Sequence, residues 1–484
     1  MLAVLSMAAS RTALRGAVAL GVLAVLYGCG PASTSAGQPV TGGTSSAQDP
    51  NDPDPVFTKQ EMADLRALSP AELPPAPPDV TNRWADDDAA AAFGQRLFFD
   101  TSFAGPLLDS DNDGTGGSLG KVGDTGRVGC SSCHVPGGAF SDTRSHQLQI
   151  SLGAGWGRRR APSLLDVGQA TLVLWDGRRD TLYNQIFGPI ESVVEMNSSR
   201  LYVAQQIQRK HQAEYEAIFG EMPALADASR FSPLSAELTG CQPKNPTDPQ
   251  PTCNGTFHGM PGDGAEFDGL SAADQEAVTR VVVNAGKALG AYERRLSCGT
   301  SAFDAWMRGD DAALSRAAQR GAALFVGKAK CVSCHAGPFM SDQKFHNVGL
   351  APDIVQQAFI DSNDAGAATG LAGALLDPLN SKGIFSDGDD GRLPAAVDAD
   401  MDGAFRTPTL RCVNKRPTFM HTGQLATLAR VVEFFDKGGV SSGYPGKNEL
   451  SKLGLSPLEK SDLVAFLEAL EGPGPDARYL EPPP

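Results

Sequence analysis

The sequence predicts a mainly helical protein with long loops, and three observations support this prediction. Apolar residues recur at helical spacing in several segments, whereas long alternating patterns typical of strands are missing. The 54 glycines and 34 prolines fall largely between the helical segments, which favours long loops. The length of 484 residues exceeds the usual size of one hydrophobic core, so two domains are expected.

Three segments carry explicit helix signals. An acidic run at 86–88 precedes AAAAFGQRLFF and predicts a capped helix. After Ser271, apolar positions between 278 and 292 recur at spacings of four, three, four and three, which predicts an amphipathic helix. The segment 456–459, SPLE, combines a capping box with proline at the first helical position. This last helix is expected to close the C-terminal domain.

The N-terminus indicates export from the cytoplasm. Residues 1–28 combine arginines with a short apolar run, which is typical of a signal peptide and too short for a convincing membrane span. LYGC, ending at Cys29, resembles a bacterial lipobox, so we expect a lipid on Cys29 and a periplasmic protein anchored to the outer membrane. Ordinary secretion without the lipid is the alternative. Residues 29–57 form a polar, flexible tether.

The net charge limits the partners. Forty-one basic residues face 56 acidic ones, giving a formal charge of -15. This balance argues against nucleic acid and anionic lipid as partners, and it suits a cationic protein. Membrane contact is therefore expected only through the lipid anchor.

The pattern CxxCH occurs twice, and three interpretations compete for it. Zinc would need four ligands at each site, and no second ligand pair lies near either motif. A redox dithiol does not require the histidine. In a c-type haem site both thiols bind the porphyrin and the histidine binds iron, which uses all three residues. The sequence therefore predicts two covalent haems, with thiols at Cys130, Cys133, Cys331 and Cys334 and axial ligands His134 and His335.

Four further cysteines need an assignment. Cys241 and Cys253 flank a polar, proline-rich stretch and are candidates for a local disulfide that closes a surface loop. Cys298 and Cys412 are left over, and the sequence alone does not decide whether they pair.

The motifs around both CxxCH sites resemble those of a known family. GQRLFFD, CSSCHVPGGAFSD and the long APSLLDVGQATLVLWDGRRDTLYNQIFGPIESVVEMN segment accompany the first, and CVSCHAGPFMSDQKFHNVGL, FRTPTLRC and FMHTGQLATLARVVEFFDKGG accompany the second. Over about residues 60–475 the chain resembles bacterial di-haem cytochrome c peroxidases and their MauG-like relatives. The resemblance implies two cytochrome-c-like haem domains, at 58–265 and 266–484.

The resemblance also implies roles for single residues. The N-terminal haem, with His134, would be the peroxidatic one, and Glu195 and Gln185 would be its catalytic pocket residues. A shielded carboxyl could move a proton between the peroxide oxygens, which agrees with the chemistry. Trp175 would relay electrons from the C-terminal haem, which carries His335.

Two positions depart from the family pattern. Where classical members carry a histidine that binds the peroxidatic iron, this chain has Ala154, so we expect an open iron site. His146 is a weaker substitute ligand. At the position of the sixth ligand of the other haem the chain has Phe435, which cannot bind iron. A vacant site, water, or a displaced ligand such as Met420, Met340 or His346 remain open, and His346 and His421 could equally be structural.

Calcium is possible but doubtful. Arg160 and Arg416 stand where the resemblance implies the family's calcium site. DxDxDG occurs at 109–114 and 398–403, but neither copy has a glutamate at the twelfth position, so solvated acidic turns are the favoured interpretation.

The leading functional hypothesis is a di-haem peroxidase. It would reduce hydrogen peroxide at the N-terminal haem with electrons from a small cytochrome c or cupredoxin, relayed by the C-terminal haem. A MauG-like enzyme would instead use peroxide-derived high-valent iron to oxidise Trp or Tyr of a protein substrate. A non-catalytic di-haem electron-transfer cytochrome is the alternative outside enzymes, and a haem-based sensor is disfavoured because no signalling module is appended.

Overall fold

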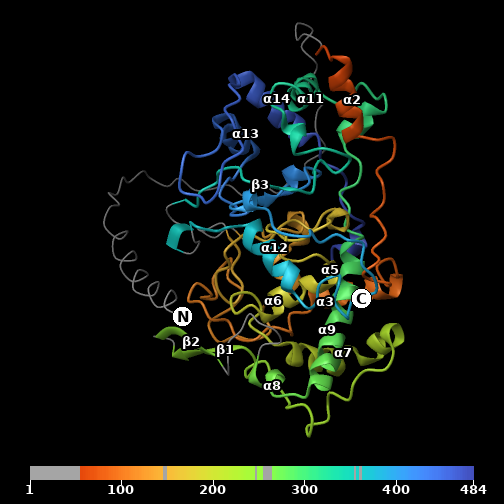
Figure 1. The fold of residues 1–484 in the computed structure, drawn as a ribbon, viewed down its shortest axis with the longest axis vertical. Coiled ribbons are helices and arrows are strands. Elements are labelled where there is room, and N and C mark those ends of the chain that lie inside the picture. Colours follow the sequence, from red (N-terminus) through yellow and green to blue (C-terminus); the bar gives the residue numbers. More distant parts are fainter. Residues whose placement is uncertain are drawn as a thin grey trace, which may run out of the picture. The chain divides into compact units, whose positions relative to one another are not determined.

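The described part of the chain is mainly helical, as the sequence predicts (Figure 1). The computed structural model describes residues 55–144, 150–245, 248–253, 264–353, 356–358 and 362–483, without the side chains of 243–253 and 358. Strands form two small antiparallel pairs, β1 with β2 and β3 with β4. The helices are α2 (Lys59–Leu68), α3 (Asp88–Phe99), α4 (Cys130–Cys133), α5 (Leu182–Gln185), α6 (Phe187–Glu191), α7 (Arg200–Phe219), α8 (Ala265–Asp268), α9 (Ala272–Glu293), α10 (Ala302–Met307), α11 (Arg316–Val326), α12 (Ala367–Leu376), α13 (Leu428–Lys437) and α14 (Pro457–Glu468), and the strands are β1 (Cys241–Asn245), β2 (Asp248–Cys253), β3 (Phe345–His346) and β4 (Phe405–Arg406).

The three predicted helix starts are confirmed. The Asp87 carboxylate accepts the Ala90 N–H at the start of α3, and the Ser271 hydroxyl accepts the Asp274 N–H at the start of α9. Ser456 and Glu459 form the expected reciprocal capping box of α14. Each cap satisfies backbone donors that the first helical turn leaves unpaired, which fixes where the helix begins.

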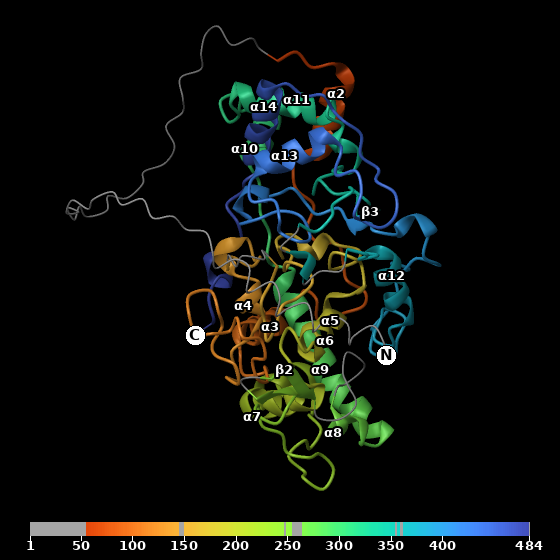
Figure 2. The same ribbon diagram turned by 90° about the vertical axis from the view of Figure 1, so that its left-hand side faces the viewer.

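The helices of residues 55–484 pack into two main apolar clusters (Figure 2). The first cluster is built around α3, α7 and α9, and the second around α2, α11, α13 and α14. Glycine lets the central pairs approach closely. A Cβ on Gly94 of α3 would lie 2.0 Å from the Ala288 carbonyl oxygen of α9, and a Cβ on Gly321 of α11 would meet Asp462 of α14 at the same distance.

This packing does not follow the expected division at 265/266. Helix α9 lies after that boundary in the sequence but packs on α3 and α7 in the first cluster. Helix α2 lies before the boundary but packs on α11 in the second cluster. Sequence periodicity shows that a helix has an apolar face but does not name its packing partner. The division into two haem domains stays a prediction.

Of the four cysteines that remain apart from Cys29 and the CxxCH motifs, two form a disulfide in the described part of the chain. Cys298, just after α9, is disulfide-bonded to Cys412, and the bridge joins segments separated by 114 residues. Cys241 and Cys253 stand opposite each other in the β1–β2 ladder. The side chain of Cys253 lies outside the described part, so that bond stays a prediction favoured by the register.

Several N-terminal predictions fall outside the described residues. These are the signal peptide 1–28, the lipidation site Cys29 and most of the tether 29–57. In the part of the chain that is described, no helix has the length and apolar character needed to cross a membrane.

Candidate active site

Each CxxCH motif lies in the wall of its own cavity. The first cavity, which contains Cys130, Cys133 and His134, has a volume of about 820 Å³. The second cavity contains Cys331, Cys334 and His335 and has a volume of about 450 Å³. Both volumes are in the range of sites for cofactor-sized ligands.

Local backbone structure gives both histidines the same orientation. Each motif forms a short helical turn, and the ring then folds back onto a main-chain carbonyl. His134 Nδ1 lies 3.0 Å from the Phe140 carbonyl oxygen, and His335 Nδ1 lies 2.8 Å from that of Met340. In this arrangement Nδ1–H donates, so Nε2 is the nitrogen that could bind iron. Burial lowers the pKa of both rings, to about 4 for His335, which keeps them neutral as a ligand requires.

The thiols do not resemble those of a redox dithiol. Burial raises the pKa of Cys130, Cys133 and Cys331 to about 12. Catalytic dithiols need the opposite shift, because the thiolate is the nucleophile. All four CxxCH thiols are unpaired among the described residues. The geometry therefore fits a haem anchor better than a redox pair.

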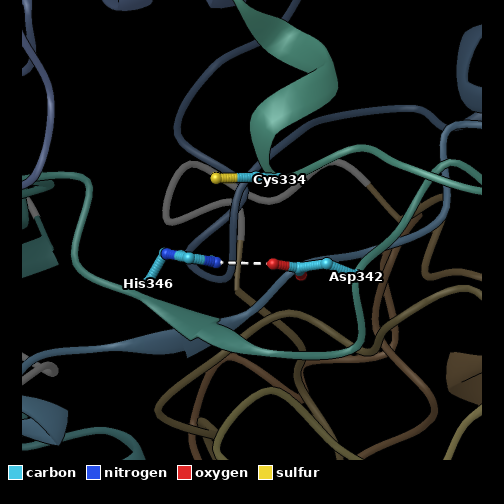
Figure 3. A group of neighbouring side chains, drawn as sticks. All are labelled: Cys334, Asp342 and His346. Atoms are coloured by element: carbon cyan, nitrogen blue, oxygen red, sulfur yellow. Dashed lines mark hydrogen bonds and ion pairs between the residues drawn. The ribbon is translucent and has the colours of Figure 1, made fainter. Parts of the chain in front are cut away.

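One group in the described residues could in principle hold a metal ion: Cys334, Asp342 and His346 (Figure 3). His346 is already engaged on both sides, with Nε2 2.9 Å from Asp342 and Nδ1 2.7 Å from Glu449. Contacts with Cys334, Glu449 and Asp342 raise the pKa of His346 to about 10. Both ring nitrogens of His346 are thus used in contacts with carboxylates, which favours a structural hydrogen-bonding role.

The structure brings Glu195 and Gln185 into the first cavity, together with His134. Gln185 comes from the end of α5, and Glu195 from the turn between α6 and α7. Glu195 has an exposed surface and lines the cavity, while neighbouring protein atoms crowd its carboxyl. This burial raises the pKa of Glu195, and the nearby Arg178 guanidinium partly opposes the shift. A raised pKa makes the carboxylate a better proton acceptor, so such a carboxyl is suited to proton exchange.

The loop that carries Ala154 lies directly beside Glu195. The Ala154 N–H donates to the Glu195 carbonyl oxygen at 2.8 Å, and the Gly155 N–H donates to Val194 at 2.9 Å. Ala154 itself is fully buried in the first apolar cluster, and the neighbouring Gly153 forms part of the cavity wall. His146 lies outside the described residues, so its role as a substitute ligand stays untested.

Trp175 lines both cavities. Its indole Nε1–H donates to the Arg160 carbonyl oxygen at 2.8 Å. The main-chain carbonyl oxygen of Trp175 accepts the Arg406 N–H, also at 2.8 Å. On the second-cavity side its ring makes an edge contact with His421, with centroids 6.4 Å apart. His421 in turn stacks on Phe405 at 3.6 Å. An aromatic series thus starts at the wall that the two cavities share.

The second cavity has an apolar wall around Phe435, the position where the resemblance implies a sixth ligand of the C-terminal haem. Leu428, Val431, Val432 and Phe435 of α13 line it, as the periodicity of that helix predicts. Met420 also lines this cavity, whereas Met340 is fully buried and does not contribute to the wall. Burial lowers the pKa of His421 to about 3, and its stacked position favours a structural role.

Two half-buried arginines in the second cavity indicate the charge of its ligand. Arg406 and Arg416 line the cavity without a salt bridge to a described residue, although the Asp166 carboxylate in the same wall interacts electrostatically with Arg416. Burial lowers the pKa of each to about 10, and Arg416 Nε has no hydrogen-bond partner there. Buried cations need anionic partners. Haem carries two propionates, so these residues fit the group.

The residues considered for calcium make contacts within the chain itself. Arg160 and Arg416 both line the second cavity and donate to main-chain carbonyls, of Asp142 and Thr409 respectively. In the 109–114 turn the carboxylates bind chain atoms: Asp111 accepts the Trp156 indole N–H at 2.8 Å. The 398–403 turn brings no third potential ligand to its carboxylates. Both acidic motifs fit the interpretation as turns.

Some lining residues could not be assigned to this site from the sequence. A segment from the second half of the chain, around α12, forms part of the wall of the first cavity, through Asp364, Gly373, Leu376 and Asp377. Glu293 of α9 is buried in the same wall, and desolvation raises its pKa to about 8. The sequence offers no local signal for these contacts, because they join residues about 200 positions apart.

Comparison with known proteins agrees with this geometry. Residues 88–236 match the family model described as di-haem cytochrome c peroxidase. The chain is 38% identical over 217 residues to cytochrome-c peroxidase IdrP1 of Denitromonas iodatirespirans, covering 43% of this chain and 53% of that protein. It is 29% identical over 385 residues to methylamine utilization protein MauG of Methylorubrum extorquens, covering 78% and 77%.

A solved structure shares the fold. The diheme peroxidase BthA from Burkholderia thailandensis aligns with a TM-score of 0.54 at 21% identity, covering 85% of this chain and 96% of that one. The match to IdrP1 spans about half of that protein, whereas the match to MauG spans most of both chains. Residues 88–236 thus match the di-haem cytochrome c peroxidase family, and the chain is similar over most of its length to the MauG protein.

Proposed function

We propose that this protein is a di-haem peroxidase that reduces hydrogen peroxide in the first cavity with electrons that arrive through the second. The proposal depends on one observation: the two cavities share Trp175 but differ in the polar side chains that line them. Trp175 lines both cavities, whereas Glu195 and Gln185 line only the first. The second cavity also has a buried carboxyl, Asp166, but α13 gives that cavity an apolar wall.

The CxxCH residues would hold the cofactors. Cys130 and Cys133 in the first cavity, and Cys331 and Cys334 in the second, would form thioethers to haem, with Nε2 of the adjacent histidine on iron. When bound, haem supplies an iron that binds and activates peroxide in the first cavity and exchanges electrons in the second. The Nδ1 contacts to main-chain carbonyls keep each imidazole in the orientation and tautomer that ligation needs.

Glu195 would manage the proton. Cleavage of the O–O bond requires a proton to leave the oxygen nearer iron and to reach the departing oxygen. In its carboxylate form Glu195 takes the first proton, and as the acid it gives it back. Desolvation by the surrounding protein raises the pKa of Glu195 and so makes it a better proton acceptor, and Arg178 limits the rise. Gln185, in the same wall, can hydrogen-bond the incoming peroxide.

The overall reaction consumes two electrons and two protons. Hydrogen peroxide loses its O–O bond and yields two water molecules, and the electrons come one at a time from an external donor. A small cytochrome c or a cupredoxin is the proposed donor class, because the net charge of -15 would attract a cationic protein. Trp175 would relay the electrons between the cavities.

The proposed location follows from the N-terminal sequence. Residues 1–28 would direct export to the periplasm, and Cys29 would carry a lipid in the outer membrane, with 29–57 as the tether. Haem attachment in the periplasm is compatible with the Cys298–Cys412 disulfide, because disulfides persist in oxidising compartments.

Substitution of Glu195 tests the proposal. Glu195→Gln keeps the size of the side chain but removes the proton exchange, so peroxide turnover should fall by about 10²-fold or more while both haems stay attached. Glu221→Gln, an exposed carboxyl in the same half of the chain, is the matched control and should leave turnover unchanged. Equal turnover in both variants would remove Glu195 from the mechanism.

A MauG-like reaction on a protein substrate is the second candidate. Ala154 replaces an iron-binding histidine beside Glu195, and Phe435 contributes only apolar surface to the second cavity. Both features would let the oxidising power of peroxide persist long enough to oxidise Trp or Tyr of a partner. An electron-transfer cytochrome without catalysis would show no reaction with peroxide, which the same assay would reveal.

A further inference from the structure

The two cavities differ in size although they are expected to hold the same group. The first measures about 820 Å³ and the second about 450 Å³, so the first is larger by about 370 Å³. A water molecule occupies about 30 Å³ of liquid volume, and hydrogen peroxide is only slightly larger. If each cavity holds one haem, the first leaves about 370 Å³ more space beside that group than the second, which is many times the volume of hydrogen peroxide.

The first cavity has a wall at α12 that the second cavity lacks. Residues of α12 and the turn after it line the first cavity and have no counterpart in the second. Leu376 there is 84% exposed, and Val194, which also lines this cavity, is 37% exposed. Gly373 is exposed as well, and a Cβ built on it would meet nothing within 4 Å. We call the space bordered by Gly373, Leu376 and Val194 the antechamber.

The antechamber adjoins the Glu195 carboxyl. Val194 precedes Glu195 in the chain, and Arg178 interacts electrostatically with that carboxyl. Arg178 Nη1 pairs with Asp176 at 2.9 Å, and the Asp176 carbonyl oxygen would lie 2.1 Å from a Cβ on Gly370 of α12. The first turns of α12 are therefore packed tightly against the segment that carries Trp175 and Arg178. A molecule in the antechamber could place one end at Glu195.

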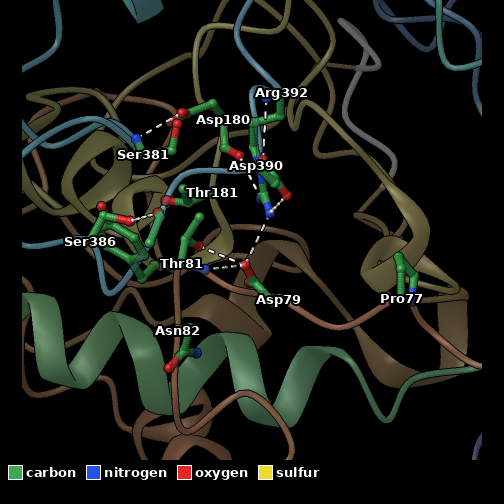
Figure 4. A network of polar contacts seen from close by, with 12 residues as sticks. Pro77, Asp79, Thr81, Asn82, Asp180, Thr181, Ser381, Ser386, Asp390 and Arg392 are labelled. Atoms are coloured by element: carbon green, nitrogen blue, oxygen red, sulfur yellow. Dashed lines mark hydrogen bonds and ion pairs between the residues drawn. The ribbon is translucent and has the colours of Figure 1, made fainter.

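Polar contacts hold this wall in place (Figure 4). Asp377, directly after α12, forms an ion pair with Arg179. The Ser381 N–H donates to Asp180 at 2.8 Å, and Arg392 Nη1 donates to the Asp180 carbonyl oxygen at 2.9 Å. These contacts tie the segment after α12 to the start of α5. The antechamber is thus formed by the folded chain itself and does not need a partner to build it.

We propose that the antechamber admits organic hydroperoxides with an apolar body, which react at the first haem alongside hydrogen peroxide. The inference rests on the proposed function and names a wider substrate class for it. The apolar body would lie against Leu376, Val194 and the open face at Gly373, with the peroxy group at Glu195. Reduction breaks the O–O bond, takes two protons and two electrons from the same one-electron donor protein, and yields an alcohol and water.

Ligand binding tests the shape of the antechamber independently of turnover. The ferric holoprotein is titrated with 4-phenylimidazole, a bulky apolar iron ligand, and with cyanide, a small one, and the Soret band is followed. Gly373→Trp fills the antechamber and should weaken 4-phenylimidazole binding at least about tenfold, while cyanide affinity changes less than about twofold. Ala372→Trp is the control, because residue 372 is exposed on the same helix but does not line the cavity. Binding at the second haem provides an internal reference.

Turnover with cumene hydroperoxide completes the test. Wild type should reduce it, and Gly373→Trp should lower its kcat/KM about tenfold while that for hydrogen peroxide stays within about twofold. Unchanged 4-phenylimidazole binding in Gly373→Trp, or no turnover of cumene hydroperoxide while hydrogen peroxide is reduced, would overturn the inference and leave the proposed function standing. Blocked 4-phenylimidazole binding without reaction of either peroxide would contradict the proposed function instead.

Discussion

The indole Nε1–H of Trp175 donates a hydrogen bond of 2.8 Å to the carbonyl oxygen of Arg160, and both residues line both cavities. Two chain segments, 160–162 and Trp175, therefore line both cavities, and this hydrogen bond joins them. A carbonyl oxygen accepts the hydrogen bond but is too weak a base to remove the indole proton. The bond therefore fixes the orientation of the ring and does not deprotonate it. Because Trp175 lines both cavities, it is the residue that we propose as the electronic connection between them.

Replacement of Trp175 should slow electron exchange between the haems. Trp175→Phe keeps an aromatic ring but removes the indole and its bond to Arg160, which costs about 1 kcal/mol of stability. Stopped-flow spectra after reduction by a donor protein should show a normal rate for the second haem and a reduced rate for the first. Trp306→Phe, a tryptophan away from both cavities, is the control. Equal inter-haem rates would leave Trp175 as packing alone.

Arg178 should set the acidic limit of peroxide turnover. The raised pKa of Glu195 means that its active carboxylate form is lost as the pH falls through that value, and Arg178 lowers the pKa. Arg178→Gln removes the cation, so the acidic limb of the kcat/KM profile should move to higher pH. Arg308→Gln, an exposed cation remote from the cavity, should leave the profile in place. A shift to lower pH would contradict this arrangement.

Removal of one pair of thiols should remove one covalent haem. A variant with Cys130→Ser and Cys133→Ser should retain haem only through Cys331 and Cys334, which mass spectrometry and the pyridine haemochrome spectrum would show as half of the wild-type content. Cys298→Ser breaks only the disulfide and should keep the full content. Full covalent haem in the double variant would exclude the first motif as an anchor.

The buried Asp304–Arg411 pair should stabilise the second cluster in a pH-dependent way. Arg411 Nη1 lies 2.8 Å from Asp304, and contacts with Arg411 and neighbouring donors outweigh burial and lower the pKa of Asp304 to about 2. Because the folded pKa lies below the unfolded value of about 4, this stabilisation is full above pH 4 and is lost as the pH falls toward 2.

Asp304→Asn would leave the Arg411 cation buried without a counter-charge. It should lower the free energy of unfolding at pH 7 by about 3 kcal/mol, and the difference from wild type should shrink in acid. Denaturant unfolding at several pH values measures both effects, with the exposed Asp311→Asn as control. A difference that does not depend on pH would show that the ion pair is not its cause.

Local patterns could be predicted from the sequence, and long-range contacts could not. The caps at Asp87, Ser271 and Ser456 fixed the starts of α3, α9 and α14 because capping is decided within one turn. The periodicity of α9 did not reveal that it packs on α3, across the expected domain boundary. Packing partners depend on the whole fold, so the periodicity of one helix leaves them open.

The same distinction applies to the site. CxxCH is a local motif, and each copy was found in a cavity wall. Glu195, Gln185 and Trp175 were named through the resemblance, and the structure places the first two in one cavity. The contribution of Gly373 and Leu376 was not predicted, because a glycine and a leucine in a helix carry no chemical signal until the helix is placed.

The reaction of the fully oxidised holoprotein with hydrogen peroxide tests the central claim most directly. The protein is mixed with one equivalent of peroxide and no reductant, and stopped-flow absorption and EPR follow both haems. Since Ala154 stands beside Glu195 without an iron-binding side chain, we predict a rapid spectral change that starts from a high-spin ferric signal. No reaction until one haem is reduced would mean that another side chain, such as His146, occupies the iron, and it would contradict an open first site.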